Sequence, residues 1–127
     1  MPNTPADLGD EQYVLLTTYR RTGIGVPTAV WAARDGDALI VATPDHAGKA
    51  KRVRNSAQVT LQACGMLGRP RRGSLPLPGR AEAITGEAAE QAIAPLAAKY
   101  GLLYRLARIA GLYGKPGHVA VFRITAP

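Results

Sequence analysis

The sequence contains few of the residues from which disulfides and metal sites are built. Its 127 residues include a single cysteine, Cys64, and two histidines, His46 and His118. One cysteine cannot form an internal disulfide, and three such residues argue against a Cys/His zinc site. We therefore expect no metal and a core that is held together by packing alone.

Long apolar runs are absent as well. No stretch approaches the ~20 residues that a membrane-spanning helix needs. The N-terminus lacks the basic-then-apolar order of a signal peptide. We expect a soluble, cytoplasmic protein without membrane insertion.

The chain shows no recognisable catalytic residues. Neither Ser56 nor Ser74 has a His/Asp neighbourhood that would indicate a hydrolytic triad. Cys64 lies in an alternating stretch and is predicted to be a small buried hydrophobic residue. No glycine fingerprint follows a strand, as a dinucleotide site or a phosphate-binding loop requires. We name no catalytic residue and expect any chemistry to belong to a bound cofactor.

Acidic residues are missing from much of the sequence. Sixteen Lys+Arg against nine Asp+Glu give a net charge of +7, and eight of the basic residues lie between His46 and Ala81, where no acid occurs. Such clustering favours an anionic partner, whether nucleic acid, a membrane surface or a phosphorylated small molecule, over a merely solvated face. Single-strand binding needs aromatic side chains among the basic ones, and this stretch has none, so we expect no nucleic acid.

The hydrophobic pattern predicts one mainly β domain with helices. Residues 1–12 form a flexible tail, and 13–127 form the single domain. Short helices are expected at 49–55 and, broken at Pro95 and again at Gly101, over 87–113. A long exposed connection covers 65–78. Six strands are predicted over 13–19, 26–34, 38–43, 58–64, 80–84 and 118–124. Six antiparallel strands in so short a chain favour a closed or split barrel, because either arrangement protects the strand edges.

One apolar stripe marks the second helix of the pair before the last strand. Leu102, Leu106, Ile109 and Tyr113 recur at i, i+4, i+7 and i+11. We expect this stripe to dock on the barrel. Contact of this basic helix with a membrane surface is the alternative.

The segment Gly48-Lys49-Ala50-Lys51-Arg52 has the composition of an anion site. Lys49 and Arg52 are three residues apart and share a helix face, whereas Lys51 points about 200° away from Lys49. Gly48 opens the helix, where free backbone N–H groups favour an anion. The segment predicts a phosphate clamp, and a solvated basic turn is the alternative.

Several stretches together resemble a known family. They are Tyr13 to Arg21, Val26 to Trp31, the Asp35-Gly36 turn, Leu39 to Thr43, and Gly48 to Arg54. In order and spacing they are similar to the deazaflavin-dependent branch of the pyridoxamine-phosphate-oxidase-like split β-barrel proteins, a branch known from actinobacteria. The resemblance is close from about Tyr13 to Thr85 and looser beyond it. It implies a homodimer with two sites for coenzyme F420 at the protomer interface, with FMN as the alternative cofactor.

The same resemblance implies roles for individual residues. Lys49 and Arg52 match positions that hold the cofactor's phosphate, and Lys51 is a weaker candidate for its acidic oligoglutamate tail. Thr43 and Gly48 match the loop over the phosphate. The candidate cofactor-binding residues are Pro27, Thr28, Trp31, Ala42, Thr43, Gly48, Lys49, Lys51 and Arg52.

These observations predict an F420-dependent oxidoreductase that transfers hydride between the deazaflavin and a small conjugated or aromatic substrate. One alternative is a protein that binds F420, FMN or haem without turnover. A basic nucleic-acid-binding β-barrel is a further alternative, against which the missing aromatic residues argue.

Overall fold

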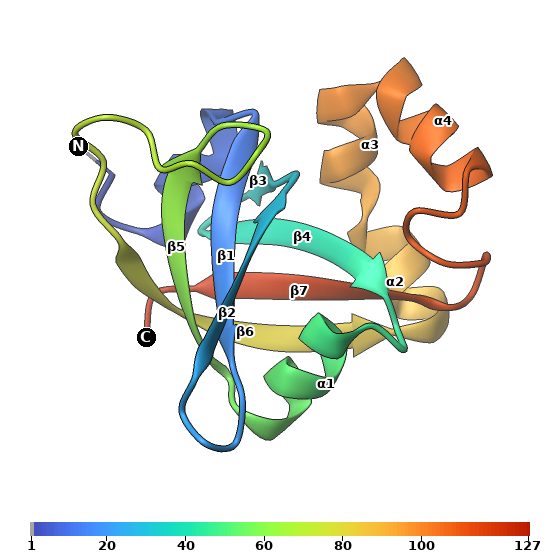
Figure 1. Ribbon diagram of the computed structural model, residues 1–127. Helices are drawn as coiled ribbons and strands as arrows, with labels where there is room; N and C mark the ends of the chain where they lie inside the picture. The colour runs from blue at the N-terminus through green and yellow to red at the C-terminus, as the bar shows by residue number, and fades with distance from the viewer. Residues whose placement is uncertain (1) are drawn as a thin grey trace.

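A computed structural model describes residues 2–127 and shows a single seven-stranded antiparallel sheet (Figure 1). The strand order is β2-β1-β5-β6-β7-β4-β3. In Figure 1, β1, β2 and β5 stand steeply across β4, β6 and β7, so the sheet is strongly bent. The strands are β1 (Tyr13–Tyr19), β2 (Gly25–Val30), β3 (Ala33–Asp35), β4 (Ala38–Pro44), β5 (Gln58–Cys64), β6 (Leu77–Thr85) and β7 (Val119–Thr125).

Four α-helices and one 3-10 helix complete the structure. Helix α1 lies between β4 and β5, and the other three α-helices lie between β6 and β7, in the places that the sequence predicted. Their bounds are η1 (Pro5–Asp10), α1 (Gly48–Asn55), α2 (Gly86–Ala92), α3 (Ala94–Tyr100) and α4 (Leu102–Ile109). The break between α2 and α3 falls next to Pro95, which lacks the N–H that an unbroken helix would use.

The prediction of six strands was wrong in one place. The expected strand over 26–34 is two strands, β2 and β3, separated by Trp31 and Ala32. Strand β2 pairs with β1, and β3 pairs with β4, so the two lie at opposite edges of the sheet. The sheet is therefore open rather than a closed barrel, yet its two edges are joined by only two residues. This short connection forces the sheet to curl until its edges approach one another.

The connection between β2 and β3 is held by two neighbouring residues of α3. The Tyr100 hydroxyl donates to the carbonyl of Gln12 at 2.8 Å and accepts from the N–H of Ala32 at 3.1 Å. Lys99 Nζ donates to three backbone carbonyls, those of Gly9, Glu11 and Ala32, at 2.8, 2.5 and 2.6 Å. Since a chain that leaves one edge strand for another has unpaired backbone groups, these bonds supply the partners that the sheet does not.

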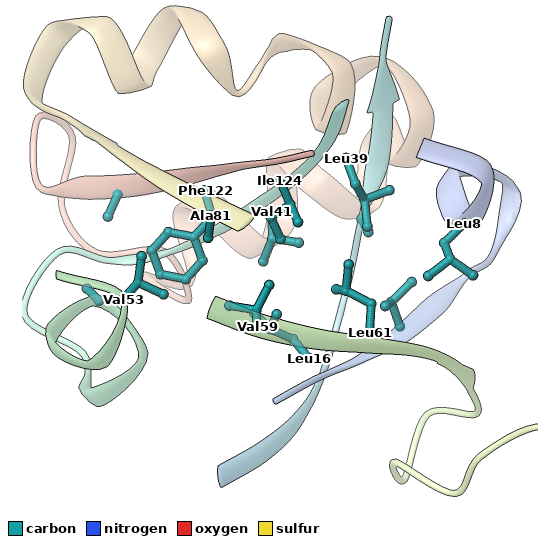
Figure 2. Close-up of a cluster of buried hydrophobic side chains, with 14 of the residues drawn as sticks. Leu8, Leu16, Leu39, Val41, Val53, Val59, Leu61, Ala81, Phe122 and Ile124 are labelled. Atoms are coloured by element: carbon teal, nitrogen blue, oxygen red, sulfur yellow. The ribbon is translucent and has the colours of Figure 1, made fainter. Parts of the chain in front are cut away.

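The main core fills the space inside the bent sheet (Figure 2). Alternate residues of β4, Leu39 and Val41, point into it, and they meet Phe122 and Ile124 of β7. The intervening residues of β4 and β7 face α2 and α3 in a second cluster. Both faces of β4 are thus covered, which explains its unbroken apolar run from Ala38 to Ala42.

The N-terminal segment takes part in this core. The sequence predicted a flexible tail over 1–12, whereas Pro5–Asp10 form η1 and Leu8 is 2% exposed among the core side chains. The loop after β5 is likewise tied to the sheet: the Gln62 amide donates to the Ser74 carbonyl at 3.2 Å, and Arg71 pairs with Glu11 at 3.2 Å. Residue 1 lies outside the described residues.

Helix α4 is oriented opposite to the prediction. Its buried or half-buried residues are Tyr104, Ala107 and Arg108, and the Arg108 guanidinium donates to Glu90 Oε2 at 2.8 Å. Leu106 and Ile109, from the stripe that was expected to dock on the sheet, are 53% and 84% exposed. The polar contact of Arg108 with Glu90, the small Ala107 side chain and the Tyr104 ring, which packs against the second cluster, attach this helix in place of the apolar stripe.

We predict that the Tyr100 hydroxyl stabilises the connection between β2 and β3. Tyr100→Phe removes the partner of the Ala32 N–H and of the Gln12 carbonyl, which should lower the free energy of unfolding by about 1–3 kcal/mol. Urea denaturation measures this loss. The phenylalanine ring can still stack on Trp31, the only tryptophan, so its near-ultraviolet circular dichroism should persist in Tyr100→Phe and decline in Tyr100→Leu. An unchanged unfolding midpoint in Tyr100→Phe would contradict the assignment.

Candidate functional site

A cavity of about 230 Å³ lies where the two edges of the curled sheet come together. Its walls come mainly from β2 and β4, which share no hydrogen-bonded ladder. Helix α4 and the turn after it form another side, and β1 and α1 contribute one residue each. The lining residues are Tyr13, Thr28, Ala29, Val30, Trp31, Ala42, Thr43, Pro44, Lys49, Ala107, Leu112 and Tyr113. The cavity is thus a product of the tertiary fold rather than of any one element.

An aromatic side chain forms part of the wall on the β2 side. Trp31 immediately follows β2, and its ring stacks on Tyr100 with centroids 4.4 Å apart and planes 7° from parallel. Because Tyr100 is itself held by backbone hydrogen bonds, the indole orientation is fixed by the same contacts that hold the edge connection. Small residues next to it, Thr28 and Ala29, leave space for a flat ligand beside the strand.

Thr43, one of the residues that line this cavity, carries an unsatisfied hydroxyl. The residue is 1% exposed, and its Oγ1 has no hydrogen-bond partner among the described residues. A buried hydroxyl without a partner costs about 1–3 kcal/mol, so such groups are rare and call for an explanation. Its side chain lies on the same face of β4 as Leu39 and Val41, with Ala120 of β7 opposite it.

Two cations lie close together at the start of α1. Burial, together with the charge of Arg52, lowers the pKa of Lys49 below its usual range. Neither side chain forms an ion pair with an acid among residues 2–127. Arg52 Nε donates to the buried Thr18 hydroxyl at 2.7 Å, which fixes the guanidinium beside the helix start. Two like charges without an acidic partner make a site for an anion.

Gly48 lies against the end of the Arg52 side chain. A Cβ at position 48 would lie 2.8 Å from Arg52 Nη1, closer than real Cβ contacts come. The glycine therefore leaves room for the guanidinium to fold back against the first turn of α1. Lys49 and Arg52 are on one side of the helix as predicted, and Lys51 is exposed.

The structure brings five of the nine candidate residues to the cavity wall: Thr28, Trp31, Ala42, Thr43 and Lys49. The other four are placed elsewhere. Gly48 and Arg52 are next to Lys49 but do not line the cavity, while Pro27 and Lys51 are exposed.

Sequence reasoning did not find the wall contributed by α4 and the turn after it. Ala107, Leu112 and Tyr113 line the cavity, although Tyr113 had been assigned to the docking stripe of the helix. Burial raises the pKa of the Tyr113 phenol, with smaller contributions from Tyr100 and Tyr104, so this hydroxyl stays protonated. Its aromatic ring beside a glycine-rich turn was the only local signal that could have identified it.

The residues of the cavity fit a flavin-type cofactor with a phosphate group. Such a cofactor requires an anion site for its phosphate, a polar partner near its ring and a flat apolar wall. Lys49 with Arg52, the unpartnered Thr43 hydroxyl, and Trp31 with Tyr113 provide these three features. The fit rests mainly on Lys49 and Arg52, because neither has an acidic partner among the described residues.

Comparison with known proteins gives matches only at the level of structure. No family model matches the sequence, and no curated protein matches it. A protein of unknown function from Agrobacterium tumefaciens superposes with a TM-score of 0.72 at 19% identity over 94% of this chain, which spans only 50% of that protein. A putative pyridoxamine 5'-phosphate oxidase from Listeria innocua gives 0.63 at 18% identity, covering 94% of this chain and 87% of that one. An F420 reductase gives 0.66 at 18% identity, covering 100% and 96%.

The same fold occurs in proteins that hold different cofactors. Matching structures include an FMN-binding protein from Nostoc punctiforme, a FAD-binding protein from Mesorhizobium loti and a haem storage protein from Vibrio cholerae. The chain therefore has a pyridoxamine-phosphate-oxidase-like fold. At identities of 16% to 19%, these likenesses establish the fold and leave the cofactor to the residues of the site.

We predict opposite effects on stability for two buried threonines. Thr43→Val removes a hydroxyl that has no partner, and the free energy of unfolding should rise by up to about 1 kcal/mol in the protein without ligand. Thr18→Val removes the acceptor of Arg52 Nε and should lower the free energy of unfolding by about 1–3 kcal/mol. Urea denaturation of both variants beside the wild type measures the difference. A loss of stability in Thr43→Val equal to that in Thr18→Val would show that the Thr43 hydroxyl is satisfied.

Proposed function

We propose that this protein is an F420-dependent oxidoreductase that transfers hydride between the deazaflavin and a small conjugated or aromatic substrate. The observation that carries the proposal is the combination of an unsatisfied hydroxyl at Thr43 with the unpaired Lys49–Arg52 cations, at a cavity walled by Trp31 and Tyr113. The structural likeness to an F420 reductase along the whole length of both chains supports it.

The cations would hold the cofactor's phosphate. An anion beside Lys49 relieves the repulsion from Arg52 and offsets the burial that lowers the lysine pKa. The guanidinium is already oriented by Thr18, so little side-chain freedom is lost when an anion binds.

The aromatic walls would orient a flat ring and keep water from it. Trp31 cannot easily rotate because Tyr100 covers one side of it, and Tyr113 is half-buried. A bound deazaflavin supplies hydride transfer from C5 without the one-electron and oxygen chemistry of a flavin. In this assignment the protein contributes binding, orientation and a dry site, and no side chain is named as an acid or base.

The proposal includes a second copy of the chain. The cavity in one chain, about 230 Å³, is smaller than the 300–1,000 Å³ that is typical of ligand pockets. A homodimer in which the partner closes the open side would complete the site. Lys51, exposed and on the far side of α1, stays a candidate for contact with an acidic cofactor tail.

Binding without turnover is the second candidate function. FMN-binding and haem-storing proteins share this fold, and no side chain of the cavity has the arrangement of a catalytic pair. The same clamp would then hold FMN or F420 for another purpose. The basic stretch from His46 to Ala81 contains no aromatic side chain on which bases could stack, which argues against nucleic acid.

The first test is a fluorescence titration of the purified protein with oxidised F420, with FMN and with a short single-stranded oligonucleotide, each at two salt concentrations. We expect micromolar or tighter binding of F420 and weaker binding of FMN. Reduced F420 is then offered with conjugated carbonyl compounds and quinones, and its reoxidation is followed by absorbance. Binding of FMN alone would move the assignment to the second candidate, and binding of the oligonucleotide alone would end both.

We predict that the clamp residues contribute to cofactor affinity and their neighbour does not. Lys49→Ala and Arg52→Ala should each weaken F420 binding roughly 10-fold to 100-fold, since a charge-assisted contact contributes about 1.5–3 kcal/mol. Arg54→Ala removes the same charge from the exposed, opposite side of the same helix and is the matched control. Circular dichroism checks that each variant is folded. Equal losses in all three variants would indicate general electrostatic attraction rather than a clamp.

A further inference from the structure

Large apolar side chains that face solvent are concentrated in two segments. Nine such side chains are exposed among residues 2–127, and eight of them belong either to the loop between β5 and β6 or to α4 and the turn after it. The three in the loop are Met66, Leu67 and Leu75; the five in the helical segment are Leu102, Leu103, Leu106, Ile109 and Leu112. In Figure 1 this loop and α4 both lie in the upper part of the view, the loop on the left and α4 on the right.

The outer side of α4 is an apolar face with a basic flank. At 3.6 residues per turn, Leu102, Leu106 and Ile109 lie in one row, and the exposed Arg105 lies beside it. The opposite side holds Ala107 and the Arg108–Glu90 ion pair, which attach the helix to the domain. The apolar face therefore takes no part in holding the fold together.

Acidic residues are absent from both segments. Residues 65–76 contain Arg69, Arg71 and Arg72 without an acid, and no Asp or Glu occurs after Glu90. Arg71 pairs with Glu11, and Arg108 pairs with Glu90. Arg69, Arg72, Arg105 and Lys115 are exposed and form no ion pair with the described acids.

We propose that α4 and the 65–76 loop together form a docking surface for an anionic lipid bilayer. Leucine and isoleucine side chains would enter the boundary between headgroups and acyl chains, and the flanking cations would meet lipid phosphates. The attachment is peripheral: no helix among residues 2–127 is long and apolar enough to cross a membrane.

Charge favours a bilayer over a second copy of the chain on this face. In a two-fold dimer, the same surface of each copy forms the interface. The unpaired arginines of one copy would therefore approach those of the other without an acid between them. The apolar residues also sit on two separate projections, each with its own cations. A planar anionic surface can receive both projections at once and neutralises them.

The proposal is tested by cosedimentation of the full chain with vesicles. One set consists of phosphatidylcholine alone, and the other includes a minority of phosphatidylglycerol. We expect binding to the mixed vesicles, little binding to phosphatidylcholine, and weaker binding at high salt, because screening reduces the attraction of the cations. Absence of binding to the mixed vesicles overturns the proposal.

Variants then separate lipid contact from general attraction. Leu106→Gln with Ile109→Gln should weaken vesicle binding at least roughly tenfold, since each removes a large side chain from the lipid boundary. Ile24→Gln is the matched control and should have no effect, because Ile24 is the one exposed large apolar residue outside the two segments among residues 2–127. Arg105→Gln with Lys115→Gln should reduce binding to the mixed vesicles alone.

Light scattering on the same variants tests the alternative that a second copy of the chain covers this face. We expect Leu106→Gln with Ile109→Gln to keep the molecular mass of the wild type in solution. A fall from dimer to monomer would assign this face to a second copy and overturn the proposal. Vesicle binding that is unchanged in this double variant, or lost equally in Ile24→Gln, overturns it as well. None of these residues lines the cavity, so a variant that keeps the molecular mass of the wild type should also keep its F420 affinity, which separates this proposal from the proposed function.

Discussion

The two-residue connection between β2 and β3 is the constraint on which the rest of the structure depends. It takes the chain from one edge of the sheet to the other within Trp31 and Ala32. A sheet with edges joined so closely must curl, and the curl encloses the core and leaves the cavity at the seam. Lys99 and Tyr100 satisfy the backbone at this point, and Tyr100 also holds the Trp31 ring in the cavity wall. Stability and site geometry therefore rest on the same few contacts.

The cavity combines groups that are individually unfavourable in the protein alone. Thr43 keeps a buried hydroxyl without a partner, and Lys49 lies beside Arg52 with its pKa lowered by burial and by that second charge. Each costs stability in the protein alone. Unsatisfied polarity of this kind is expected where a ligand supplies the missing partners. It is the physical basis for preferring a ligand site to a solvated basic turn.

Local signals in the sequence were enough to predict most elements but not how they face one another. The turn after Asp35, the helix break at Pro95 and the basic helix from Gly48 were all foreseen, because each depends on residues close in sequence. The division of the 26–34 strand was not foreseen, because Val30 and Ala33 continue the same apolar pattern on either side of it. The orientation of α4 was missed for a related reason: periodicity identifies a stripe, while the ion pair of Arg108 with Glu90, 18 residues earlier, decides which side is buried. The cavity wall at Tyr113 likewise depends on contacts that are distant in sequence.

Helix α4 separates two roles by its geometry. Successive residues are about 100° apart around a helix, so Ala107, which lines the cavity, and Leu106 and Ile109, which face solvent, lie on different sides. A surface that binds the outer side therefore leaves the cavity side free. The turn after the helix connects the solvent-facing side with the cavity side, because Leu112 is exposed and also lines the cavity. A bilayer on the outer side would place apolar molecules next to the cavity at this residue, which suits the apolar walls that Trp31 and Tyr113 present within it.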